Sequence, residues 1–189
     1  MLSQLILKRK AKYRSCRAAI IEENVAALYL LFLFLFFPML DLATMGLRAF
    51  FLWFACEQAA MAGAKGTVWS NTAYPNNYYT CIQTQAQSAA TSFVNMFSGI
   101  TVTSGPNLVV IAQAIPNTSA ATINPYTPSP STYLDKSLYV PILQVTMTGT
   151  VQPFIVIPFI PMSIPGLNAP FTMTVMSEQQ IENPTALSY

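Results

Sequence analysis

The chain offers few side chains that could carry out catalysis. It contains no histidine, which excludes Ser-His-Asp and Cys-His catalytic groups, histidine-ligated zinc and histidine acid–base chemistry. Three acids of the C-terminal half, Asp135, Glu178 and Glu182, have no second group at a recognisable catalytic spacing. We therefore predict that the protein is not an enzyme, that it has no catalytic, cofactor or metal site, and that it takes no small-molecule substrate.

Two adjacent carboxylates, Glu22 and Glu23, stand where charge is costly. They precede an uncharged run from Asn24 to Leu40, whose centre reads LYLLFLFLFF. A helix needs about 20 apolar residues to cross a bilayer, so this run predicts a membrane span. Carboxylates at a membrane edge cost free energy unless they have a use. The simplest interpretation is that both are helix-start acids in the headgroup layer, favoured by the N-terminal end of the helix dipole.

The basic residues are concentrated at the N-terminus. Six of the nine lysines and arginines lie in the first 17 positions, where there is no acid, whereas from Ala18 onward three basic residues face seven acidic ones. A short basic arm could bind RNA, but the apolar run follows it directly, so the positive-inside rule explains these residues better. We expect a single span with residues 1–17 in the cytoplasm, and no nucleic-acid partner.

The apolar run does not have the form of a secretory signal peptide. Its apolar core is longer than usual, and the first small-residue cleavage pattern, Ala60-Met-Ala62, lies far beyond it. Good helix formers instead continue past Pro38 and Asp41 to Lys65. We predict one long helix from Ala18 to about Lys65, kinked at Pro38, where one backbone hydrogen bond is lost.

The remaining chain predicts a small β-rich domain. We expect a loop at 67–80, a short helix at 82–97, strands at 100–103, 108–112, 139–154 and 171–176, and an exposed loop at 117–137. The fold class is then α+β: a long N-terminal helix, membrane-spanning in its first half, followed by a small antiparallel sheet domain with one short helix. The expected organisation is a basic leader at 1–18, the long helix at 19–65 and the α+β domain at 66–189.

An apolar, proline-interrupted loop lies between the last two strands. The run from Phe154 to Ile164 is too short and too broken to span a bilayer, because backbone groups left unpaired in lipid each cost several kcal/mol. It is either a hydrophobic docking surface or a loop packed on itself.

Several of these features together resemble the TadE-like pseudopilins. The resemblance rests on RAAIIEE at 17–23, the apolar run with its proline, Asp41, and RAFFLWFACEQAAMAGAK at 48–65, with Met61 and Ala62 where the family commonly has Arg and Glu. A V-T-M-T strand, a proline-rich apolar loop ending in Gly-Leu and a final T-M-T-V strand extend it to 138–182. The resemblance implies a pilin-like helix and a periplasmic domain.

The resemblance also implies a processing site and an assembly residue. In the type IV pilin superfamily a prepilin peptidase cuts after a small residue, and an acid at the fifth mature position helps subunits assemble. Counting back from Glu23 places the cut after Ala18 and the mature start at Ala19, whereas a register using Glu22 would require a cut after Arg17. Glu23 is then the assembly acid.

The implied function is that of a minor pilin or pseudopilin of a tight-adherence (type IVc) pilus. It would be anchored in the bacterial inner membrane, with its C-terminal domain in the periplasm. Its partners would be the membrane, the prepilin peptidase and other pilins of the same system. The alternative is an uncleaved, single-pass binding or adhesion module that enters no filament.

The three cysteines fall on two sides of the expected membrane. Cys16 lies in the basic leader, whereas Cys56 and Cys81 would lie in an oxidising periplasm that permits a disulfide. We predict that Cys56 and Cys81 pair with each other. The alternative is that Cys56 is a packed thiol on the helix and that Cys81 is buried separately.

Overall fold

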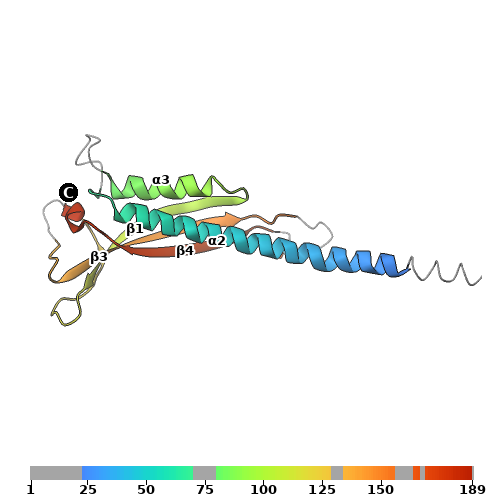
Figure 1. Ribbon diagram of the computed structural model, residues 1–189. Coiled ribbons are helices and arrows are strands. Elements are labelled where there is room, and N and C mark those ends of the chain that lie inside the picture. Colours follow the sequence, from blue (N-terminus) through green and yellow to red (C-terminus); the bar gives the residue numbers. More distant parts are fainter. Residues whose placement is uncertain (1–22, 70–79, 129–133, 156–163, 167–168, 189) are drawn as a thin grey trace, which may run out of the picture.

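A long helix and a four-stranded antiparallel sheet make up the protein, as a computed structural model shows (Figure 1). The structure describes residues 23–69, 80–128, 134–155, 164–166 and 169–188. A shorter helix follows the long one in sequence and lies beside it. The α+β fold class predicted from the sequence is confirmed.

The long helix is continuous from Glu23 to Ala64. It is helical from Glu23, passes through a π-helical turn at Phe32–Phe36 (η1), and continues as α2 (Phe37–Ala64). The predicted end near Lys65 is confirmed, since Lys65 is the C-cap residue and Gly66 donates a backbone hydrogen bond to the Gly63 carbonyl. The predicted start at Ala18 lies outside the described residues.

Pro38 lies inside the long helix without interrupting it. Because proline has no N–H and its ring crowds the carbonyl four residues earlier, it cannot be fitted into regular α-helix without an adjustment. The π-helical turn at Phe32–Phe36 directly precedes it and widens the backbone there. The sequence predicted a kink and the loss of one backbone hydrogen bond at Pro38, but not this π-helical turn.

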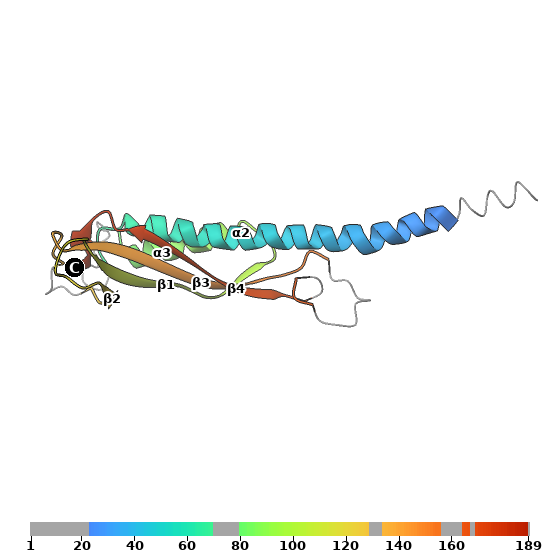
Figure 2. The same ribbon diagram turned by 90° about the horizontal axis from the view of Figure 1, so that it is seen from below.

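The sheet has the order β2-β1-β3-β4, with every neighbouring pair antiparallel. Its strands are β1 (Ile100–Ala114), β2 (Ile123–Tyr126), β3 (Tyr139–Val151) and β4 (Phe171–Gln180). The short helix α3 (Ile82–Val94) precedes β1, and a 3-10 helix, η2 (Pro184–Ser188), follows β4. Figure 2 shows the strands running alongside the second half of the long helix.

Two details of the predicted domain are corrected by the structure. The two strands expected at 100–103 and 108–112 form one strand, β1, whose register shifts at Val102, Ser104 and Asn107 accommodate the Ser104-Gly-Pro segment. The loop expected at 117–137 contains β2, which pairs with β1 through Val110↔Tyr126 and Ala112↔Ile123. Proline had argued against a strand there, but an edge strand tolerates proline because one side of its backbone is unpaired.

The core lies between one face of the sheet and the two helices. Along β3 the buried residues alternate with partly exposed ones, so Leu143, Val145 and Met147 face inward. Small residues of α2, among them Ala55, Ala59, Ala60 and Gly63, are buried and permit close approach of the neighbouring elements. The opposite face carries polar cross-strand pairs, such as Thr148 with Thr174 at 2.9 Å between hydroxyl oxygens and Gln144 with Glu178 at 2.7 Å.

Candidate membrane-anchoring site

Among the described residues, very little covers the first half of the long helix. Its most apolar 18-residue window is only 6% buried, and it is long and apolar enough to cross a membrane. Large apolar side chains exposed along it are Val25, Leu28, Tyr29, Leu30, Leu31, Phe32, Phe34, Leu35, Phe36 and Met39. A contiguous apolar surface of this size is unfavourable in water, so it needs a lipid or protein environment.

The predicted processing and assembly residues lie at the beginning of this half. Ala18, Ala19 and Glu22 are outside the described residues. Glu23 is the first residue that the structure describes, and its side chain is exposed at the start of the helix. It is separated from the sheet domain by the whole apolar half, so its charge does not support the core.

The two cysteines beyond the span are free thiols, and the predicted disulfide is not present. Cys56 lies on the sheet-facing side of α2, and its thiol donates to the Val145 carbonyl at 3.2 Å. The Cys81 thiol, at the start of α3, donates to the Trp69 carbonyl at 3.3 Å. The disulfide was expected only because both cysteines would lie in the same oxidising compartment. In the fold, the two thiols lie next to different residues and donate to different carbonyls.

Burial governs the chemistry of Cys56. Its side chain has no solvent exposure, and desolvation raises the pKa of the thiol to about 11. Backbone hydrogen bonds act in the opposite direction and the nearby Glu57 carboxylate raises the pKa further. Because the thiolate is the reactive form, Cys56 is an inert core thiol at neutral pH.

Asp41 is a buried acid whose position the sequence did not explain. It is fully buried, and its Oδ1 accepts hydrogen bonds from the backbone N–H groups of Phe154 at 2.6 Å and of Ile155 at 3.3 Å. Its Oδ2 has no hydrogen-bond partner within the described part of the chain. The residue therefore fastens the beginning of the β3–β4 connection to the long helix, directly after the exposed apolar half.

Arg48 reinforces the same attachment two helical turns later. Its Nη1 donates to the Gln152 carbonyl at 2.5 Å, and its guanidinium lies 5.9 Å from the centre of the Phe154 ring. Asp41 thus accepts hydrogen bonds from backbone N–H groups, and Arg48 donates one to a backbone carbonyl, of the same short stretch of chain. We name this arrangement, Asp41 and Arg48 with residues 152–155, the loop clamp. Spacing alone could not reveal it, because its partners lie more than 100 positions away in sequence.

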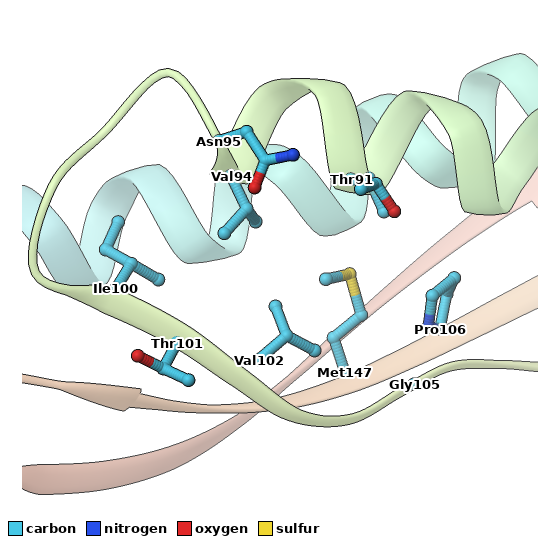
Figure 3. A pocket seen from close by; sticks show the side chains of 10 residues that line it. Thr91, Val94, Asn95, Ile100, Thr101, Val102, Gly105, Pro106 and Met147 are labelled. Carbon is cyan, nitrogen blue, oxygen red and sulfur yellow. The ribbon is translucent and has the colours of Figure 1, made fainter.

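A groove lies between α3 and the sheet (Figure 3). It has a volume of about 340 Å³, and its lining contains no ionisable side chain: Ala90, Thr91, Val94, Asn95, Ile100, Thr101, Val102, Gly105, Pro106 and Met147. Hydroxyl and amide groups of Thr91, Asn95 and Thr101 supply its polarity. The groove can accommodate uncharged groups, but its lining supplies no general acid or base.

Two of the three acids considered as catalytic candidates, Asp135 and Glu178, have structural roles in the domain. Asp135 accepts hydrogen bonds from the Ser137 hydroxyl at 2.7 Å and the Ser137 N–H at 2.9 Å, which lower the pKa of Asp135. Glu178 accepts from the Gln144 amide across the open face of the sheet. Within the described ranges, no group of three or more histidine, cysteine or acidic residues could hold a metal ion.

Comparisons of the chain with family models, with curated proteins and with solved structures gave no match. The function is therefore inferred from the residues themselves and from how the fold arranges them.

Proposed function

We propose that the protein is a TadE-like minor pilin or pseudopilin, a structural subunit that supports assembly of a tight-adherence pilus. The observation that carries this proposal is the division of one continuous helix into two environments. The half that begins at Glu23 is apolar and exposed, whereas the half from Met45 to Ala64 buries one side against the sheet and α3. A subunit that must stay in a membrane and later pack beside other helices needs such a division.

The exposed half is the proposed inner-membrane anchor. With the basic leader in the cytoplasm, the sheet domain would lie in the periplasm. The prepilin peptidase would cut after Ala18, which frees an α-amino group at Ala19. That amine and the Glu23 carboxylate of a neighbouring subunit attract each other by several kcal/mol where water is scarce. In this role the exposure of Glu23 makes it available to a partner molecule.

N-terminal sequencing of the protein extracted from membranes tests the processing step. We expect a mature N-terminus at Ala19 in cells that contain the prepilin peptidase, and an intact leader in cells that lack it. An intact leader in both strains would contradict the pilin assignment.

A pair of adjacent substitutions tests the assembly step. Glu23→Gln should lower the yield of pili sheared from cells while its membrane abundance stays at the parental level, because the side chain lies far from the domain core. Glu22→Gln is the matched control and should have a much weaker effect. If Glu22→Gln abolishes pili and Glu23→Gln does not, the register is wrong.

The groove between α3 and the sheet favours one alternative, an uncleaved single-pass module that binds an uncharged ligand or partner segment. In that case both glutamate variants should retain full function and the leader should remain attached. Substitution in the groove, for example Thr91→Trp, would then abolish binding, whereas under the pilin proposal it would leave pilus yield near the parental value.

A further inference from the structure

Exposed apolar side chains of the domain collect at one end of the sheet. Phe154 and Ile164 flank the β3–β4 connection and are 58% and 37% exposed. Phe171, which is 40% exposed, begins β4 opposite Val151, the last residue of β3. These three residues, Phe154, Ile164 and Phe171, form what we call the end patch. Met96, in the α3–β1 connection at the same end of the sheet, is also exposed.

The loop clamp fixes Phe154 of the end patch to a defined level of the long helix. Asp41 binds the backbone at Phe154 and Ile155, Arg48 binds the Gln152 carbonyl, and Gly166 lies against Met45. All of these contacts fall on the part of the helix that follows its exposed half. Figure 2 shows the connected end of β3 and β4 directed along the helix toward that half.

Helix geometry places this level at the surface of a bilayer. An α-helix rises about 1.5 Å per residue, so the roughly 20 residues needed to cross the hydrocarbon layer extend from Glu23 to about Leu42. Asp41 lies within that last turn, and Met39 and Leu42 beside it are exposed. The end patch is therefore held where the helix leaves the hydrocarbon layer.

The charge distribution matches this position. There is no charged residue between Lys136 and Glu178, an interval that includes the whole β3–β4 connection. The two charges nearest the end patch, Asp41 and Arg48, are both directed to backbone groups of the loop clamp. The chain's other charges beyond Glu57 belong to the opposite end of the sheet or to the middle of its strands: Lys65, Asp135, Lys136, Glu178 and Glu182.

We infer that the end patch is a second membrane contact: Phe154, Ile164 and Phe171 insert into the interfacial layer of the leaflet from which the long helix emerges. This inference rests on the membrane anchor of the proposed function. A second contact, separate from the helix, fixes the rotation of the domain about the helix axis and holds the uncharged end of the sheet against lipid. The chemistry recognised is the acyl and headgroup boundary of a bilayer, not a particular lipid.

Depth-dependent fluorescence quenching on the full chain in liposomes tests this contact. Phe154→Cys and Ile164→Cys are each made in a Cys16→Ser background and labelled with an environment-sensitive fluorophore, since Cys56 and Cys81 are buried and Cys56 is unreactive at neutral pH. Lipids brominated on their acyl chains are the quencher. Leu31→Cys reports on the anchor, and Ile123→Cys, an exposed apolar site on β2 that is 41% exposed, is the matched control.

We expect loss of fluorescence at positions 31, 154 and 164, and none at 123. Quenching at 31 without quenching at 154 and 164 overturns the second contact and leaves the anchor intact. Emission shifted to the blue at 154 and 164 without quenching means that these two positions pack on protein, which also overturns the second contact. Absence of quenching at 31 overturns the anchor itself, and with it both proposals. Circular dichroism of each labelled protein must match the parent.

Discussion

At Asp41 a single carboxylate oxygen satisfies two backbone donors of the β3–β4 connection, while the other oxygen is buried without a hydrogen-bond partner among the residues that the structure describes. A neutral acceptor at the same place would satisfy the same donors without the cost of a buried charge. Both hydrogen bonds of the Asp41 carboxylate to this connection go to Oδ1. A substitution that keeps this oxygen but removes the charge can therefore separate the effect of the hydrogen bonds from that of the charge.

Substitution of Asp41 should distinguish these two effects. Asp41→Ala leaves the N–H groups of Phe154 and Ile155 without their acceptor, and we expect the free energy of unfolding to fall by roughly 1–3 kcal/mol. Asp41→Asn keeps an oxygen in the Oδ1 position and should cost clearly less. Urea unfolding in detergent, followed by circular dichroism, measures both. Equal losses for the two variants would mean that the charge, not the hydrogen bonds, stabilises the attachment.

The pKa of Cys56 predicts a stability change at alkaline pH. Burial raises the pKa of the thiol from 9.0 to about 11, so between these values the unfolded chain loses a proton that the folded chain retains. The stabilising contribution of the protonated Cys56 thiol is complete below pH 9 and is lost as the pH rises toward 11. The free energy of unfolding therefore falls over this interval.

The measurement compares the parent with Cys56→Ala across that pH interval. Both proteins contain the same lysines and tyrosines, so only the difference in slope reports on Cys56, and the variant should show the shallower decline. Thiol alkylation provides a second readout: in non-reduced parent protein Cys56 and Cys81 should both react after unfolding. Failure of both to react in denaturant would indicate a disulfide.

At the scale of elements, close packing of α2 against α3 and the sheet depends on small residues. At Gly63 a Cβ atom would lie 2.7 Å from Leu143 Cδ2 and 3.3 Å from Ala86 Cβ, closer than side-chain contacts allow without movement. At Gly46, on the same helix, a Cβ atom would meet nothing within 4 Å. The two glycines of α2 thus differ in their packing but share the helical backbone.

This pair allows packing to be separated from helix propensity. Gly63→Ala should lower the free energy of unfolding by roughly 1–2 kcal/mol, because overpacking of a close helix crossing outweighs the gain in propensity of about 1 kcal/mol. Gly46→Ala, the matched control, should leave stability unchanged or raise it. Thermal unfolding in detergent checks both variants. A Gly63→Ala protein as stable as Gly46→Ala would show that Leu143 moves away at little cost.

At the scale of the whole molecule, charge is distributed along one axis. The basic leader precedes the apolar half of the long helix in sequence, and five of the eight charged residues that follow Leu40 belong to the half of the domain far from it: Lys65, Asp135, Lys136, Glu178 and Glu182. Such a distribution favours a single orientation in a membrane, because positively charged segments are preferentially retained on the cytoplasmic side.

Topology reporters test this orientation. An enzyme that is active only outside the cytoplasm, fused after Tyr189, should be active, and the same fusion should lose activity when the six leader lysines and arginines are replaced by glutamine. The parent fusion and the substituted fusion carry the same reporter at the same site, so their activities can be compared once their expression levels are known. Immunoblotting measures those levels. A stable but inactive fusion on the parent chain would contradict the proposed orientation.

The sequence by itself determined the features that depend on neighbouring residues. The apolar run after Glu23, the helix formers up to Lys65 and the alternation along β3 each report on a local environment, so the helix, the α+β class and the main strands were predictable. Local turn signals were less informative: Ser104-Gly-Pro was absorbed into β1 by shifts of register, and Pro125 was tolerated in the edge strand β2.

Only the tertiary structure decided which distant groups meet. Asp41 and the Phe154 backbone lie 113 positions apart in sequence. The Cys56 thiol donates to the Val145 carbonyl, 89 positions away, and forms no disulfide with Cys81. Hydrophobic patterning specifies which side of an element is buried, but it does not specify which atoms of another element lie against it. That choice depends on the packing of α2 over β3 and β4, and it places the loop clamp at the end of the exposed apolar half.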